Sequence, residues 1–318
     1  MATMNALTFT KGGVENLTVV SIERPEPRPT EVLVRVDAAG VNPIDWTTRD
    51  GGGVYANFDQ SSPMILGWDV AGVVEEVGAG VTRFRKGERV FGMPRFPDPA
   101  GAYAEFVVAP SRQLTRIPEG VADLAAAAVP LSGLTAYQAI VDALHVGQGD
   151  RVLIHGAGGN VGQLAVQIAK ARRAEVWASE VSGRQDVLTK LGVDHAINSD
   201  VDDFAELASD MNAVLDLVGT EQSSVRALRT LVDGGRLVVL SSPSDLPSEE
   251  QLAEANVTGR WMLVEPDYAG LDALAAMLSY GLLKVSLAET RPMSEIGALH
   301  EIGEAGDTPG RLVATVWD

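Results

Sequence analysis

The sequence contains no cysteine among its 318 residues. Disulfides, a thiolate nucleophile and zinc sites with sulfur ligands are therefore excluded. Only four histidines are present, at positions 145, 155, 195 and 300, and none of their spacings matches H-x-x-H or H-E-x-x-H. We therefore interpret each histidine as a surface or packing residue rather than as a metal ligand.

Long apolar runs and an excess of basic residues are also missing. No apolar segment approaches the length that spans a bilayer, and the first twelve residues lack a basic stretch followed by a long apolar core. We therefore expect a cytoplasmic protein without a membrane partner. The formal net charge of −18 would repel nucleic acid and anionic lipid, so neither is an expected partner.

What the sequence does contain is a glycine-rich turn between two regular segments. Residues 152–162 read Val-Leu-Ile-His-Gly-Ala-Gly-Gly-Asn-Val-Gly, and apolar residues then recur at helical spacing from Val161 to Ala169. A second apolar run at 175–178 completes a βαβ unit of the expected length. Glycines let the backbone approach a pyrophosphate, and a helix N-terminus attracts its charge. The unit therefore predicts dinucleotide binding rather than an ordinary flexible loop.

The sequence pattern changes along the chain and divides it into two parts. Up to about residue 106, short β-like runs separated by glycine and proline suggest an irregular barrel. From about residue 122, alanine-rich helices give way to alternating strands and helices, which predict a parallel, doubly wound α/β sheet. Such a sheet binds its ligand at the carboxyl ends of the strands. No linker is evident, so we expect two tightly joined domains.

Further motifs follow one another in the order typical of one family. They occupy residues 40–45, 63–72, 87–92, 101–105, 130–137, 216–219, 234–236 and 300–311. With the glycine turn, they resemble the medium-chain dehydrogenase/reductase superfamily, in particular its zinc-free, zeta-crystallin-like quinone oxidoreductase branch. The resemblance covers nearly the whole chain.

The resemblance implies an α/β protein of two domains. A GroES-like β-barrel catalytic domain comprises residues 1–123 and 288–318, and a Rossmann dinucleotide-binding domain comprises residues 124–287. In such proteins the nicotinamide lies in the cleft between the two domains. A homodimer is also implied, with residues 238–240 and 261–264 as candidates for the paired sheet edge.

The resemblance further implies which residues bind the cofactor. They are Thr135, Gly156, Ala157, Gly158, Gly159, Asn160, Val161, Ser179, Glu180, Ser182, Arg184, Val218, Gly219, Leu240 and Ser241.

The form of the cofactor depends on the end of the second strand. Ser179, Ser182 and Arg184 are suited to a 2′-phosphate, whereas Glu180 is close to the position where NAD enzymes carry an acid that binds the ribose 2′-OH. The family favours NADPH, and NADH stays open. Alternatively, Glu180 points to solvent and Arg184 merely begins the next helix.

Hydride transfer to a quinone or an α,β-unsaturated carbonyl is the implied reaction, without metal. Zinc-dependent relatives carry a cysteine and a histidine where this chain has Asn42 or its neighbours and Trp68. Asn42 is the candidate that holds a substrate oxygen or the nicotinamide ribose, and Tyr55 is the candidate proton donor. Asp45 is either catalytic or a structural acceptor for backbone N–H groups.

Alternatives remain open at this point. Trp46 and Trp68 either line an apolar substrate pocket or pack in the core. The protein could be a biosynthetic enoyl reductase, or an NADPH-binding protein without significant turnover. A zinc alcohol dehydrogenase is the least favoured alternative.

Overall fold

The computed structural model describes residues 2–306 and 309–317. The chain forms two compact units, one of Met1–Leu134 with Glu265–Asp318, and the other of Thr135–Val264. These divisions, at 134/135 and 264/265, differ from the sequence-based domain boundaries at 123/124 and 287/288. No helix in the described part of the chain is long and apolar enough to cross a bilayer.

The first unit contains two β-sheets. Their strands are β1 (Thr3–Phe9), β2 (Leu17–Glu23), β3 (Glu31–Val41), β4 (Met64–Ile65), β5 (Asp69–Val77), β6 (Arg89–Gly92), β7 (Phe106–Pro110), β8 (Leu114–Arg116), β15 (Leu287–Pro292) and β16 (Arg311–Thr315). One sheet has the order β2-β1-β4, and the other β15-β16-β3-β5-β6-β8 with β7 also paired to β3. Strand β3 is buried along most of its length, and most of its residues are apolar.

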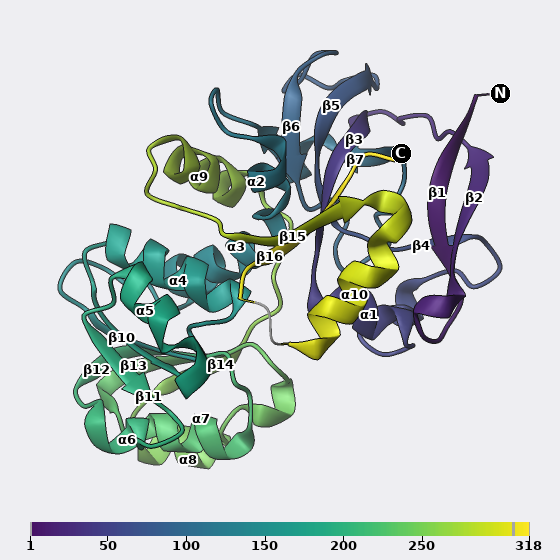
Figure 1. Cartoon of the computed structure of the whole chain (residues 1–318). Coiled ribbons are helices and arrows are strands. Elements are labelled where there is room, and N and C mark those ends of the chain that lie inside the picture. Colours follow the sequence, from purple (N-terminus) through teal and green to yellow (C-terminus); the bar gives the residue numbers. More distant parts are fainter. Residues whose placement is uncertain (1, 307–308, 318) are drawn as a thin grey trace. The chain divides into compact units, whose positions relative to one another are not determined.

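The end of the chain returns to the N-terminal sheet. Strand β16 pairs antiparallel with β3, and β15 pairs parallel with β16 (Figure 1). This confirms the expected fold, in which the last residues complete the N-terminal domain.

Short helices complete the first unit. They are η1 (Val14–Asn16), α1 (Pro43–Arg49), η2 (Tyr55–Asn57), η3 (Ser111–Gln113), α2 (Asp123–Ala127), α9 (Tyr268–Ser279), η7 (Met293–Glu295) and α10 (Ile296–Ala305), while α3 (Pro130–Tyr137) continues into the second unit. Helix α1 begins at Pro43, where a missing N–H is harmless. The Asp45 carboxylate accepts a hydrogen bond from the Asn42 N–H, 2.7 Å away, and fixes the start of the helix.

The second unit is a parallel sheet with helices on both faces. Its strands are β9 (Arg151–His155), β10 (Glu175–Glu180), β11 (His195–Asn198), β12 (Met211–Asp216), β13 (Leu231–Val239) and β14 (Thr258–Trp261), in the order β11-β10-β9-β12-β13-β14. Its helices are η4 (Gln138–Ala143), α4 (Asn160–Ala171), η5 (Ser182–Arg184), α5 (Gln185–Leu191), α6 (Phe204–Leu207), α7 (Glu221–Leu228), η6 (Pro243–Asp245) and α8 (Glu249–Glu254). Figure 1 shows α4 and α5 on one face, and α6, α7 and α8 on the other. The predicted doubly wound sheet is confirmed.

One detail bears on the predicted dimer edge. Residues 238 and 239 lie in β13, which is paired with β12 on one side and with β14 on the other. An interior strand has no free edge, so of the two predicted segments only the one that begins in β14 reaches the edge of the sheet.

Close packing of the glycine turn explains why α4 carries a glycine in its first turn. A Cβ at Gly162 would lie 2.6 Å from the Cα of Ala157 and 2.7 Å from its carbonyl oxygen. Because both neighbours are backbone atoms, neither can rotate out of the way. The apolar face predicted for α4 is buried at Leu164, Ala165, Ile168 and Ala169.

We therefore expect Gly162→Ala to destabilise the second unit by about 1–3 kcal/mol, since the turn and the helix must separate. The matched control is Gly147→Ala, because a Cβ at Gly147 meets nothing within 4 Å. The control should change the free energy of unfolding by less than about 0.5 kcal/mol. Urea unfolding of the two variants measures the difference, and equal stabilities would contradict the packing argument.

Candidate functional site

The glycine turn of the second unit is anchored on the neighbouring strand. Gly156 follows the end of β9 with φ of +84°, a conformation that favours glycine. The N–H groups of Gly156 and Ala157 both donate to the Ser179 carbonyl in β10, at 3.0 and 3.1 Å. The turn is therefore held at the carboxyl end of the sheet.

Glu180, the last residue of β10, completes this anchor. Its carboxylate accepts hydrogen bonds from the Gly158 N–H at 2.6 Å and from the Val181 N–H at 3.0 Å. Glu180 is only 8% exposed, so the side chain lies against the turn and does not point to solvent. A Cβ at Gly158 would lie 2.6 Å from Glu180 Oε2, so a larger residue there would displace the Glu180 side chain.

Helix α4 presents its first N–H groups at the same edge. Its first residues are Asn160, Val161 and Gly162, and the first helical hydrogen bond is donated by Gln163 to the Gly159 carbonyl at 2.9 Å. The N–H groups of the three preceding residues have no acceptor inside the helix. Such a terminus can bind the negative charge of a phosphate.

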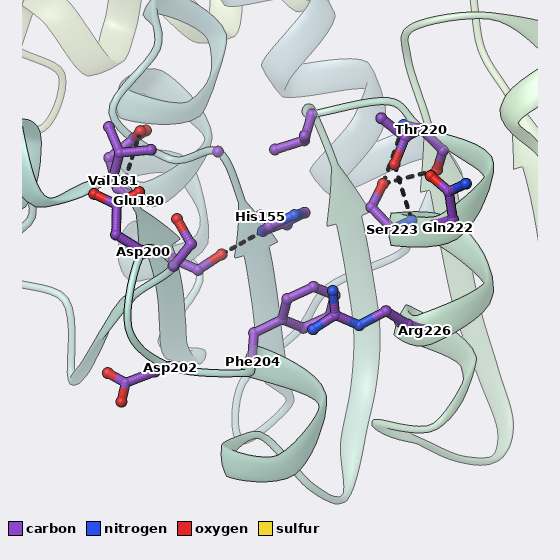
Figure 2. Close-up of a pocket in the computed structure, with 14 residues that line it drawn as sticks. His155, Glu180, Val181, Asp200, Asp202, Phe204, Thr220, Gln222, Ser223 and Arg226 are labelled. Atoms are coloured by element: carbon purple, nitrogen blue, oxygen red, sulfur yellow. Dashed lines mark hydrogen bonds between the residues drawn. The ribbon is translucent and has the colours of Figure 1, made fainter.

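A pocket of about 380 Å³ opens beside Glu180, at the carboxyl ends of β9, β10, β11 and β12. It is lined by His155, Gly156, Ser179, Glu180, Val181, Ser199, Asp200, Asp202, Phe204, Val218, Thr220, Gln222, Ser223 and Arg226. Figure 2 shows Glu180, Val181 and Asp200 on one side of the pocket, and Thr220, Gln222, Ser223 and Arg226 on the other, with His155 between them. This is the position in which a doubly wound sheet binds its ligand.

Two rings form part of the pocket wall. His155 Nδ1 lies 2.5 Å from the Ser179 hydroxyl, and burial lowers the pKa of His155, which favours the neutral ring. The ring centroid of Phe204 is 4.4 Å from that of His155. The Arg226 guanidinium lies 5.0 Å from the Phe204 centroid and also donates to Asp203.

The structure brings together only part of the predicted cofactor set. Gly156, Ser179, Glu180 and Val218 line the pocket. Ala157, Gly158, Gly159, Asn160 and Val161 form the turn and the start of α4, and Gly219 follows Val218 with φ of +69°. Leu240 and Ser241 follow β13, and Thr135 is buried at the start of the second unit.

The residues expected to cradle a 2′-phosphate have other partners. The Ser182 hydroxyl lies 3.1 Å from Asn198 Oδ1, and its N–H donates to Asp200 at 2.8 Å. Arg184 ends η5 just before α5 and is absent from the pocket lining. Ten lining residues were not in the predicted set, and they include Asp200, Asp202, Thr220 and Arg226. The first three follow the ends of β11 and β12, so the carboxyl-end rule could have located them.

A second polar cluster lies inside the first unit. Asn42 is fully buried, and its side-chain amide donates to Asp69 at 2.9 Å. Arg311 donates to the same carboxylate at 3.1 Å and to the Ser132 hydroxyl at 2.9 Å. The side chains of Arg311 and Asp69 are 3% and 0% exposed, so their ion pair is excluded from water.

Asp45 adds a second carboxyl group to this cluster. It is fully buried, and burial raises its pKa to about 7, an effect that the Asn42 N–H and the nearby Tyr103 hydroxyl only partly offset. Burial also raises the pKa of Asp69 to about 6, with Arg311 acting in the opposite direction. The geometry gives Asp45 the structural acceptor role. Its role in catalysis and that of Asn42 stay predictions.

The aromatic candidates separate into two kinds. Trp68 is fully buried, and its indole N–H donates to the Asp98 carbonyl at 2.8 Å, so it packs in the core. Tyr55 is half-buried in η2, with its ring 6.3 Å from that of Phe9. Trp46 is half-buried and packs edge-on against His300, with ring centroids 6.0 Å apart.

Comparisons with known proteins support both units. Residues 28–119 match the alcohol dehydrogenase GroES-like domain, and residues 191–313 match the zinc-binding dehydrogenase family. The chain is 32% identical to the quinone oxidoreductase from Coxiella burnetii, with a TM-score of 0.91 over 99% of this chain and 100% of that one. It is 30% identical to 2-haloacrylate reductase of a Burkholderia species, over 98% of each protein.

A longer relative matches over nearly the whole chain. It is the mycocerosic acid synthase-like polyketide synthase of Mycobacterium tuberculosis, 31% identical over 96% of this chain. The match covers only 15% of that synthase.

The buried carboxyl of Asp45 predicts a pH dependence of stability. Because its pKa is raised in the folded state, the native protein holds this proton more tightly than the unfolded chain does. The free energy that this group contributes to folding is fully present below its pKa in the unfolded chain, which is near 4. That contribution is lost as the pH rises to about 7.

We therefore expect Asp45→Asn to become more stable relative to the parent protein as pH rises from 5 to 8, by up to about 3 kcal/mol. Urea unfolding across this range measures the effect. Asp233→Asn, which removes an exposed carboxyl in β13, should leave the profile parallel to that of the parent. A parallel profile for Asp45→Asn would show that Asp45 does not titrate in this range.

Proposed function

The chain belongs to the medium-chain dehydrogenase/reductase superfamily, and we propose that it is a nicotinamide-dependent reductase of quinones or α,β-unsaturated carbonyl compounds. The observation that carries the proposal is the anchored glycine turn, which presents the N-terminus of α4 beside a pocket at the carboxyl ends of four parallel strands. The names of two relatives that match over their full length, a quinone oxidoreductase and a 2-haloacrylate reductase, support the substrate class. A quinone and a haloacrylate both contain an electron-poor double bond conjugated to a carbonyl group.

The residues of the second unit fit a dinucleotide. The first N–H groups of α4 would bind the pyrophosphate, and Glu180 would accept hydrogen bonds from the adenosine ribose. Val218, Gly219, Leu240 and Ser241 follow the ends of β12 and β13, which supports their predicted contacts to the carboxamide and the second ribose. When bound, the reduced nicotinamide supplies the hydride. The family resemblance favours NADPH, whereas Glu180 favours NADH.

Catalytic zinc does not fit the residues at the positions that zinc-dependent relatives use. The Trp68 indole N–H is a donor and is bound to a carbonyl, and the Asn42 amide is bound to Asp69. In the described part of the chain, no three acidic or histidine side chains are grouped as a metal would require. We propose a reaction that needs no metal.

Reduction of a conjugated carbonyl also requires a proton after hydride transfer. Tyr55 is our candidate donor, because it is a half-buried phenol in the short helix η2 of the first unit. The hydride would add to the β-carbon of the conjugated double bond. The resulting enolate would then take the phenolic proton at its oxygen or at its α-carbon. Water would restore the proton to Tyr55.

Two alternatives are kept. The match to one segment of a polyketide synthase supports a biosynthetic enoyl reductase, which would prefer enoyl thioesters to quinones. A cofactor-binding protein without turnover would bind the dinucleotide but reduce neither acceptor. The homodimer and the cytoplasmic location stay predictions.

We expect the protein to oxidise reduced nicotinamide dinucleotide when a quinone or a 2-substituted acrylate is added, and to do so equally well after exhaustive chelation. Nicotinamide absorbance measures turnover, and metal analysis of the same sample checks the zinc content. Enoyl thioesters in the same panel separate the biosynthetic alternative. Binding without oxidation by any acceptor would reject the reductase, and loss of turnover on chelation would reject the metal-free reaction.

We expect Tyr55→Phe to lower kcat for an α,β-unsaturated carbonyl substrate by about 10²-fold, because the proton donor is lost, with little change in KM. Tyr280→Phe is the control, since Tyr280 is 80% exposed and lies outside the proposed machinery. Steady-state kinetics measure both variants. Equal kcat values for Tyr55→Phe and the parent would remove Tyr55 from the mechanism.

A further inference from the structure

We propose that Glu180 makes the adenosine end of the pocket selective for a ribose without a 2′-phosphate, so that the protein prefers NADH to NADPH. This inference rests on the proposed function, because it requires a dinucleotide in the pocket. It differs from the cofactor that the family resemblance favours, which is NADPH, and depends on the charged residues that line the pocket of this chain.

The Glu180 carboxylate lies at the end of β10, against the glycine turn. Glu180 ends β10 beside the central strand β9, and its side chain is bound to the turn that would hold the pyrophosphate. In the described structure, Oε2 accepts from the Gly158 N–H and Oε1 from the Val181 N–H. A carboxylate has about four lone-pair positions, so each oxygen can also accept from a ribose hydroxyl.

The surrounding residues hold this carboxylate in place. Its residue is 8% exposed, and Gly158 packs directly against it. Moving the side chain to make room for a phosphate would break its bond to the Gly158 N–H. Two hydroxyl groups of an unmodified ribose fit this acceptor, whereas a 2′-phosphate would add negative charge beside a fixed carboxylate.

The remaining charges of the pocket reinforce this preference. Asp200 and Asp202 are also acidic lining residues, whereas Arg226 is the only lysine or arginine in the described lining. The Arg226 guanidinium is directed at Asp203 and stacked over Phe204. The lining therefore contains three carboxyl groups and one guanidinium that is already paired.

The hydroxyl groups predicted to bind a 2′-phosphate are occupied as well. The Ser179 hydroxyl lies 2.5 Å from His155 Nδ1, and the Ser182 hydroxyl lies 3.1 Å from Asn198 Oδ1. A phosphate would have to displace both contacts and still face Glu180. Glu180 is therefore the specificity-determining residue in this inference.

The test uses ligands that carry the adenosine end without the nicotinamide. Calorimetry on the full chain would compare ADP-ribose with its 2′-phosphorylated form. We expect ADP-ribose to bind at least about tenfold more tightly, a difference that like-charge repulsion of modest size produces. Equal affinities, or tighter binding of the phosphorylated form, would overturn the inference.

The variant Glu180→Gln tests the residue itself. Glutamine has nearly the same shape, and its oxygen can still accept from the Gly158 N–H, but it carries no charge. We expect the ratio of the affinity for ADP-ribose to the affinity for its 2′-phosphorylated form to fall at least about tenfold, mainly because the variant binds the phosphorylated form more tightly. Glu254→Gln, an exposed residue that ends α8, should keep the ratio of the parent protein. An unchanged ratio in Glu180→Gln would also overturn the inference.

The two failures can be told apart. If neither fragment nor either complete dinucleotide binds, the proposed function is wrong and the inference falls with it. If both fragments bind with the wrong preference, only the inference is wrong. The parent comparison does not need the variant, so it decides the question even if Glu180→Gln does not fold.

Discussion

The glycine turn after β9 depends on the end of β10 for its shape. Gly156 and Ala157 donate to a backbone carbonyl there, and Gly158 donates to the carboxylate of Glu180. These bonds give acceptors to N–H groups that would otherwise have none in a tight, poorly solvated turn. They also fix the start of α4 relative to the pocket. One acidic side chain thereby shapes the glycine turn and, in our inference, binds the ribose.

In the first unit, a buried ion pair connects distant parts of the chain. Arg311 in β16 and Asp69 in β5 flank β3, and Asn42, at the end of that strand, donates to the same carboxylate. Buried charges are costly unless they are paired, so removal of either partner would leave the other unsatisfied. Burial raises the pKa of both carboxyl groups, to about 6 for Asp69 and to about 7 for Asp45, so the charge of the cluster depends on pH.

Much of the fold followed from the sequence because its signals are local. Apolar spacing located α4, and alternation of strands and helices predicted the parallel sheet. The return of the chain end to the first unit came from the family resemblance. Other features depended on sheet order. Sequence could not tell that β13 is interior, because pairing on both sides is a property of the assembled sheet.

By itself, the sequence determined the βαβ unit with its glycine turn, the absence of cysteine ligands and the set of candidate polar residues. Tertiary structure decided which of those residues meet. It turned Glu180 onto the glycine turn, brought Asp200 and Asp202 beside it, and gave Ser179 and Ser182 other partners. The physical reason is range: turn and helix signals act over a few neighbouring residues, whereas a pocket is formed by strand ends that are far apart in sequence.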